Sequence, residues 1–344
     1  MDGTGTFTIS LDFELAWGIR DKRRLPGYAP NILGVRDAVP RMLELFERYG
    51  VHVTWATVGL LFFDDKEDLL GHLPAQRPSY ADPALSPYPL IAGIGANERA
   101  DPYHYGLSLI RQVQQCPAQE IGSHTFSHYY CLEPGQTPAE FRADLAAAKR
   151  AAARLGIALR SLVFPRNQFS LAYLRICREA GIDAVRGIQG PWRAHEDHGR
   201  DESILVRGHR RLDQYLPLTG HNCVTPQHHE SGVVDIRSSR FLLPASSRIR
   251  SLSFLCLRRL RRSMSHAARS GSIYHLWWHP HNFGRDLADN IAFLTRVLDH
   301  YRELSEEFGM RSRNMGETAG AALAGVGAVR QPRHQRPVES AVGN

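Results

Sequence analysis

The sequence contains few cysteines, and no two of them form a C-x-x-C pair. The five cysteines stand at positions 116, 131, 177, 223 and 256, an odd number without regular spacing. A disulfide framework needs paired cysteines, and a cysteine zinc site needs closely spaced ones. The pattern therefore argues against both and favours a reducing compartment.

Long apolar runs are absent as well. No uncharged apolar segment approaches the roughly 18 residues that a membrane-spanning helix needs. Residues 1–11 lack the basic start, apolar centre and small-residue cleavage site of a signal peptide. Hydrophobic residues make up 43% of the chain and charged residues 22%, as in ordinary soluble proteins. These features predict a folded protein with a cytoplasmic location.

Segments with strand and helix periodicity alternate along the chain. Strands are expected at residues 7–11, 51–58, 159–164, 182–185 and 272–278 and directly before residue 124, and helices at 35–49, 137–156, 170–180 and 289–308. The succession of strand, helix and strand indicates parallel crossover units. Barrels built from such units often exceed 250 residues as one domain.

Three segments do not fit this alternation. Residues 63–118 are rich in proline, tyrosine and aspartate, and we expect them to form an ordered insertion near the site. Residues 187–236 resist assignment. From residue 311 the chain is rich in glycine, alanine and arginine without periodicity, which predicts a disordered tail over residues 311–344.

Four of the expected strands end in polar side chains. These are Asp12 with Glu14, His124 with His128, Arg166 with Asn167, and His279 with His281. The C-terminal ends of parallel strands meet at the edge where ligands bind, so we expect these groups to converge. Taken singly, three of these groups have a structural explanation. Asp12 and Glu14 could form a solvated acidic turn, and His124 and His128 could be a chance pair among 17 histidines. His279 and His281 could be structural histidines at a strand end.

His124 and His128 are the main metal-ligand candidates. Positions i and i+4 share one face of a helical turn, so both rings can converge on one cation. A catalytic zinc normally takes three protein ligands, which requires a carboxylate from elsewhere. The set favours a divalent metal, Zn²⁺ by default, with Co²⁺, Ni²⁺ or Mn²⁺ as alternatives. His52 is assigned to packing beside a strand, and His228 and His229 to a surface loop.

These motifs resemble those of the polysaccharide deacetylase family, the NodB-homology group of carbohydrate esterases. His124-Thr-Phe-Ser-His128 matches the family's H-[ST]-x-x-H motif, and Asp12-Phe-Glu14 is similar to its D-x-E variant of the first motif. Leu276-Trp-Trp-His279 looks like the last motif, an apolar strand that ends in histidine. The resemblance covers residues 6–306. It implies a distorted (β/α)7-type barrel that forms a single catalytic domain over residues 1–310.

The resemblance also implies roles for these residues. Asp12 would be the catalytic base and Glu14 the acidic ligand beside the histidine pair, and the two acids could exchange these roles. His279 would protonate the leaving amine. The expected substrate contacts are Asn167, Trp278 and His281.

The third motif of the family, R-x-x-P-Y, departs from the pattern. It appears only as Phe164-Pro165-Arg166-Asn167, without the arginine that normally precedes the proline and braces the base. Either Arg166 replaces that arginine or the support is absent. A backbone N–H near Arg166 would hold the oxyanion.

The implied reaction is removal of an N-acetyl or other acyl group from an amino sugar. The substrate would belong to a bacterial surface glycan or to its lipid-linked or nucleotide-linked precursor. Two alternatives stay open: hydrolysis of an amide or ureide in a small non-sugar substrate, and a glycan-binding homologue without catalysis.

The net charge of +7 is concentrated in arginines, with many between Arg237 and Arg269. Over Arg248–Arg262, leucine and isoleucine fall mostly on one half of a helical wheel and arginine largely on the other. One interpretation is a barrel helix with a solvated basic face. The other is weak peripheral contact of this face with anionic lipid at the inner membrane surface. No nucleic-acid partner is expected.

Overall fold

A computed structural model of the chain describes residues 3–22, 25–187, 212–213, 215–216, 218–244 and 250–330. The described strands are β1 (Thr6–Phe13), β2 (Val53–Thr57), β3 (Gln119–Ser123), β4 (Ser161–Leu162), β5 (Ala184–Val185), β6 (Gln227–His228), β7 (Val234–Asp235), β8 (Arg240–Phe241), β9 (Ile273–Trp278) and β10 (Arg311–Ser312). They form one curled sheet with the order β6-β7-β5-β4-β3-β2-β1-β9-β8, and β10 pairs with the start of β1. All described pairings except β6 with β7 are parallel, as the alternation of elements predicts.

β1 is the central strand, and it is buried on both faces. Phe7, Ile9 and Leu11 belong to the main hydrophobic core under the helices. The alternating residues Ser10 and Asp12 point into the curl, because both contact Arg186, which follows the distant strand β5. Strand periodicity of two therefore separates an apolar outer face from a polar inner face.

Residues 234–242 bridge the two ends of the curl. Ile236 N–H donates to Val185 O after β5, and Ser238 N–H donates to Gly187 O. Ser239 N–H then donates to His275 O in β9, and Leu242 N–H to Trp277 O. This segment consequently joins β5 to β9 and closes the barrel-like sheet, which confirms the expected distorted barrel.

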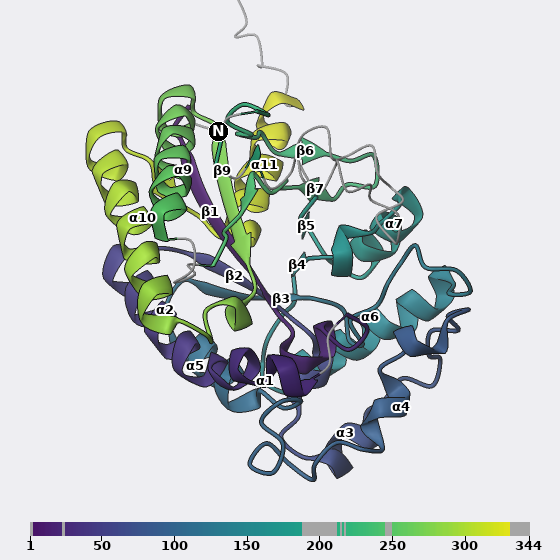
Figure 1. The fold of residues 1–344 in the computed structure, drawn as a ribbon. Coiled ribbons are helices and arrows are strands. Elements are labelled where there is room, and N and C mark those ends of the chain that lie inside the picture. The colour runs from purple at the N-terminus through teal and green to yellow at the C-terminus, as the bar shows by residue number, and fades with distance from the viewer. Residues whose placement is uncertain are drawn as a thin grey trace, which may run out of the picture.

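Helices cover the outer face of the sheet, as Figure 1 shows. The described helices are α1 (Leu25–Leu33), α2 (Val35–Tyr49), α3 (Lys66–Gly71), α4 (Tyr88–Ile91), α5 (Leu107–Gln115), α6 (Pro138–Ala153), α7 (Leu171–Glu179), α9 (Arg250–Ser270), α10 (Leu287–Phe308) and α11 (Met315–Arg330). α6 begins at the predicted capping box, in which Thr137 and Glu140 satisfy each other's backbone N–H groups. Among the described residues, no helix combines the length and apolar character needed to cross a membrane.

The expected insertion at residues 63–118 is ordered, but part of it is a regular barrel helix. α5 packs on β3 and α2 and completes the crossover between β2 and β3. The additional segment therefore spans only residues 63–106, which carry α3, α4 and a short 3-10 turn at Pro83–Leu85.

The prediction of a disordered tail is wrong for residues 311–330, which are folded. β10 extends the sheet, and α11 buries Met315 and Ala319 against Val234 and Ile273. Small side chains permit this close approach, since a Cβ on Gly316 would lie 2.7 Å from Glu120 Oε1. Alanine and glycine give almost no hydrophobic periodicity, so the sequence pattern did not indicate the helix. Residues 331–344 of the predicted tail lie outside the described residues.

Asp144 on α6 anchors the turn at residues 124–128, which follows β3. Its carboxylate accepts hydrogen bonds from Phe126 N (2.7 Å), from Ser127 N (3.1 Å) and from the Ser127 hydroxyl. Asp144 is 1% exposed. Burial raises its pKa from 3.8 to about 6, although the hydrogen bonds from Ser127 and Phe126 oppose the shift.

We therefore expect the stability of the fold to depend on the charge of Asp144. Because its pKa is higher in the folded state, the protonated form contributes stability at low pH that is lost as pH rises from about 4 through about 6. Asp144→Asn should lack this component of the pH dependence. Asp144→Ala should lose about 3 kcal/mol, since buried N–H groups lose their acceptor. Urea unfolding of the three proteins from about pH 4 to about pH 7 measures both effects, and an Ala variant as stable as wild type would contradict the anchor.

Candidate active site and metal centre

Most of the predicted residues meet at the C-terminal edge of the sheet. Asp12 and Glu14 end β1, His124 and His128 follow β3, and His279 follows β9. His128 has a φ of 55°, a left-handed conformation that is uncommon outside glycine and is often found at functional sites.

Glu14, His124 and His128 form a compact, buried group of potential metal ligands. Glu14 Oε2 lies 3.0 Å from His128 Nε2 and 3.5 Å from His124 Nε2. Two ligands of a tetrahedral zinc stand about 3.3 Å apart, so these distances suit one shared ion. His124 Nδ1 lies 2.8 Å from Val163 O and donates its proton there, which leaves the Nε2 lone pair free for a metal.

The protonation of these groups also favours a cation. Burial alone would raise the pKa of Glu14, but His279, His124 and His128 hold it well below its usual range. Burial lowers the pKa of His128 to about 3, despite the nearby Glu14 carboxylate. An ionised carboxylate and a neutral imidazole are the forms that ligate metals.

Arg20 is a neighbour of the site that the sequence did not indicate. Its NH1 group lies 3.2 Å from His128 Nδ1 and 2.6 Å from Trp17 O, and its NH2 group donates to Leu85 O at 2.6 Å. A metal on His128 Nε2 would place the ring proton on Nδ1, opposite this donor. Arg20 is therefore the side chain that contacts the Nδ1 edge of His128.

Arg186 is the partner of Asp12, and sequence analysis missed it. Its guanidinium donates to Asp12 Oδ1 at 2.7 Å and to Asp12 Oδ2 at 2.8 Å, in the bidentate geometry that arginine makes with carboxylates. Burial alone would raise the pKa of Asp12, but Arg186 brings it below the usual value. Arg186 follows the expected strand at residues 182–185, so the strand-end pattern used for the other site residues would have indicated it.

A second layer of contacts holds Arg186 in place. Its NH1 group lies 3.0 Å from Ser10 Oγ, which in turn lies 2.8 Å from His275 Nε2. Burial lowers the pKa of His275 to about 3, and its Nδ1 lies 2.9 Å from Ile236 O. Neutral His275 therefore donates from Nδ1 and accepts from Ser10 at Nε2, which leaves Ser10 Oγ as an acceptor for Arg186.

His279 and His281 complete the group around Glu14. His279 Nε2 lies 3.6 Å from Glu14 Oε1 and 3.9 Å from Asp12 Oδ2, and its side chain is 23% exposed. Its Nδ1 lies 3.3 Å from Asn282 Oδ1, so Nε2 is the atom that faces the two acids. The His281 ring stacks on His279 with centroids 4.8 Å apart, and His281 Nδ1 lies 4.0 Å from Glu14 Oε1.

Arg166 does not contact Asp12 in the way the sequence analysis considered. Its guanidinium pairs with Asp21 and Glu133 and lies over the Tyr130 ring, 4.0 Å from the centroid. The brace of Asp12 is Arg186 instead. Asn167, an expected substrate contact, has its Oδ1 3.2 Å from Arg186 NH2. Arg166 and Asn167, which follow β4, both have positive φ values, and their side chains point to different neighbours.

The expected substrate contact Trp278 is wrong. Trp278 is 0% exposed, and its ring stacks on Phe283 in the core. Trp277 lies on the face of the site, because its ring lies 4.3 Å below the Arg186 guanidinium and 5.7 Å from the His279 ring. Residues i and i+2 of a strand share a face, so the partner of His279 is Trp277 and not its direct neighbour.

The other histidines considered from the sequence lie apart from this group. His52 pairs with Glu317 of α11 at 2.7 Å. His228 lies in β6, and His229 Nε2 is 3.7 Å from Asp235.

Comparisons with known proteins relate part of the chain to one family. The model of the polysaccharide deacetylase family matches residues 27–185, a range that contains His124 and His128 but begins after Glu14 and ends before Arg186. No curated protein matches the chain.

Solved structures show the same fold at low sequence identity. A structure from Mycobacterium smegmatis described as a polysaccharide deacetylase has a TM-score of 0.59 and 14% identity, covering 98% of this chain and 96% of that one. Another so described, from Pseudomonas aeruginosa, has a TM-score of 0.53 and 12% identity over 92% and 89% of the two chains. A GH57-type branching enzyme from Pyrococcus horikoshii has a TM-score of 0.52 and 12% identity over 98% and 72%. Residues 27–185 are thus similar to the polysaccharide deacetylase family, and the chain shares its fold with solved structures described as such deacetylases.

Proposed function

We propose that the protein is a metal-dependent hydrolase that removes an N-acetyl group from an amino sugar. The match of residues 27–185 to the polysaccharide deacetylase family model supports carbohydrate deacetylase activity. The observation that carries the proposal is the arrangement around Glu14, where a carboxylate and two imidazoles lie beside Asp12 and His279. These are the groups that amide hydrolysis needs: a metal site, a base and an acid.

Glu14, His124 and His128 would hold the metal. When bound, a divalent metal supplies Lewis acidity, which favours attack of water on the amide carbonyl. Asp12, fixed by Arg186, would take a proton from the attacking water. His279 would give a proton from Nε2 to the amine as the C–N bond breaks. The products are a carboxylic acid and a free amino sugar.

The substrate we propose is an N-acetyl amino sugar of a bacterial surface glycan or of its lipid-linked or nucleotide-linked precursor. Trp277, partly exposed and next to His279, would contact the sugar ring. The same groups would also hydrolyse the amide of a small non-sugar substrate, and a glycan-binding protein without catalysis is the third reading. Acetate release from sugars would support the deacetylase, and turnover of small ureides would support the hydrolase of a non-sugar substrate. Metal binding without any turnover would support the glycan-binding protein.

The first test joins metal content to acetate release. Protein purified without chelator should contain one divalent metal and release acetate from part of a panel of nucleotide-linked and lipid-linked N-acetyl sugars. His124→Ala, His128→Ala should lose both, because only one protein ligand remains. His52→Ala, His72→Ala is the matched control and should keep both. A full equivalent of metal in the site variant would refute the assignment.

A second test separates the base from the ligand. Asp12→Asn should keep the metal and lose about 10² to 10⁴ in kcat, the usual contribution of a general base. Glu14→Gln should lose the metal. The opposite pattern of metal contents would show that the two acids exchange roles. Thermal unfolding is followed in parallel, since Asp12→Asn leaves the buried Arg186 guanidinium without its carboxylate.

A third test concerns the brace. Arg186→Met should lower kcat about 10²-fold through misplacement of Asp12 and should destabilise the fold by about 3 to 5 kcal/mol, because a buried charge loses its partner. Arg186→Lys keeps the charge but not the bidentate geometry, so its kcat and its stability should lie between those of the wild type and those of Arg186→Met. Arg166→Met should retain the Asp12 geometry. If Arg166→Met and not Arg186→Met removes activity at unchanged stability, Arg186 is not the brace.

A further inference from the structure

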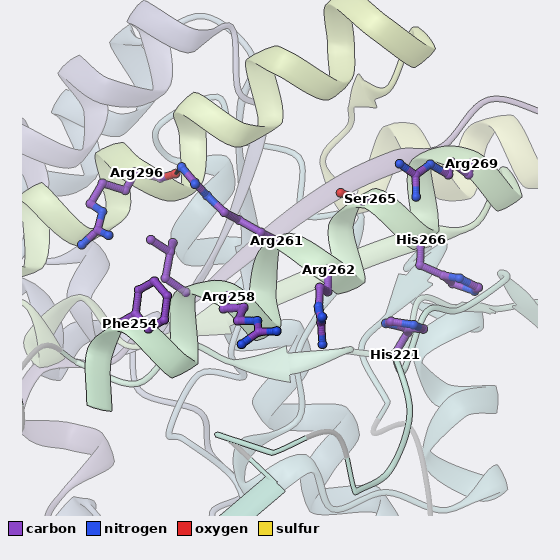
Figure 2. Close-up of a pocket in the computed structure, with 10 residues that line it drawn as sticks. His221, Phe254, Arg258, Arg261, Arg262, Ser265, His266, Arg269 and Arg296 are labelled. Carbon is purple, nitrogen blue, oxygen red and sulfur yellow. Dashed lines mark hydrogen bonds between the residues drawn. The ribbon is translucent and has the colours of Figure 1, made fainter. Parts of the chain in front are cut away.

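A basic hollow of about 610 Å³ lies on the outer side of α9, remote from the inner face of the sheet (Figure 2). Phe254, Arg258 and Arg262 follow one another at four-residue intervals and form a stripe along the helix. Arg269 extends the stripe, and Arg296 faces it from the neighbouring helix α10. No acidic residue lines the hollow among the residues that the structure describes.

The arginines of this stripe have no acidic partners within the described part of the chain. Arg258, Arg262 and Arg296 are exposed and make no ion pair with any described carboxylate. Arg259 does not belong to the exposed basic face that the sequence predicts for this helix. It is 4% exposed and donates to Asp213 at 2.9 Å, so it is structural. Arg248, which the sequence analysis included, lies outside the described residues.

Positive charge is crowded at the edge of the hollow. His221 and His266 stack with ring centroids 4.4 Å apart. The pKa of His221 is lowered by burial, and then by the nearby charges of His266, Arg259 and Arg262. An anionic surface placed over the stripe would relieve this repulsion.

Large apolar side chains are exposed on α9 and on the segment that Arg259 ties to it. Phe254 is 59% exposed, Leu212 is 54% exposed, and Leu216 and Leu218 are each 47% exposed. The segment that carries the three leucines is tied to α9, because Arg259 NH2 donates to Asp213 Oδ1 and to Gly220 O. In the described structure, bare arginines thus lie in the same hollow as one large exposed apolar side chain, Phe254.

We propose that this face, formed by Arg258, Arg262, Arg269 and Arg296 with Phe254, docks on a membrane surface that contains anionic lipid. Basic residues attract the lipid headgroups, and aromatic or leucine side chains enter the boundary between headgroups and acyl chains. A site for a small soluble phosphate ligand would use the arginines but would leave the exposure of Phe254 unexplained. The membrane accounts for both parts of the face.

Docking would bring the edge of the sheet that carries the site close to the membrane. α9 leads through Gly271 into β9, so the two run in opposite directions. From Phe254 to Ser270 the helix rises about 24 Å, and β9 returns about 20 Å to His279. Phe254 therefore lies near the level of His279. The docking itself does not depend on the reaction proposed above.

The test is cosedimentation of the full chain with vesicles of phosphatidylcholine alone or mixed with phosphatidylserine. We expect binding to the mixed vesicles only, and weaker binding at high salt. Arg258→Gln, Arg262→Gln should weaken it about 30-fold, since each basic residue at an anionic surface contributes roughly fivefold. Arg41→Gln, Arg48→Gln, the same charge change on the exposed side of α2, should have no such effect.

The apolar part of the face is tested in the same assay. Phe254→Ser should weaken vesicle binding about tenfold, whereas Leu70→Ser, at a residue 51% exposed on α3, should not. Acetate release from soluble sugars should be unchanged in all four variants, so a failure of docking is distinct from a failure of the proposed reaction. No binding to mixed vesicles at low salt overturns the proposal. So does an effect of Arg258→Gln, Arg262→Gln on inorganic pyrophosphate binding without any effect on vesicle binding.

Discussion

Two carboxylates buried at the end of β1, Asp12 and Glu14, need charged or polar partners, and the site is arranged around that need. Each is 4% exposed. An unpaired buried charge strongly lowers the free energy of unfolding, so each acid has its own set of partners. Arg186 neutralises Asp12, and histidines surround Glu14. Asp12 is therefore already paired with a fixed cation, whereas Glu14 is open to a metal.

The curl of the sheet makes this pairing possible. β1 and β5 are not neighbours in the strand order, yet Arg186 crosses the interior to reach Asp12. The inner face is polar along this line, with Ser10 and His275 under the guanidinium. Farther from the site, α11 covers the inner face with small side chains, and Glu120 accepts hydrogen bonds from Thr54, Ser161 and the backbone of Gly316. Burial raises the pKa of Glu120, which favours its neutral form there.

The metal candidates depend on support from outside the barrel interior. Asp144 holds the turn between His124 and His128, and Val163 O orients the His124 ring. Such contacts set the direction of the ligand lone pairs before any ion arrives. On the outer side of the sheet, α9 divides its arginines between a structural ion pair at Arg259 and an open stripe at Arg258 and Arg262. Helical periodicity alone places residues one apart on different faces, and here the faces have different partners.

The sequence by itself determined the alternation of elements, the bounds of α2, the capping box of α6 and the convergence of Asp12, Glu14, His124, His128 and His279. These rest on local periodicity and on the rule that parallel strands end at one edge, so no knowledge of distant contacts was required. Only the tertiary structure decided that Arg186 and not Arg166 braces Asp12, that Trp277 and not Trp278 faces the site, and that residues 315–330 form a helix against the sheet. Each of these depends on which side chains lie opposite one another across the curled sheet. Asp12 and Arg186 are 174 positions apart in the chain, and no local pattern encodes that meeting.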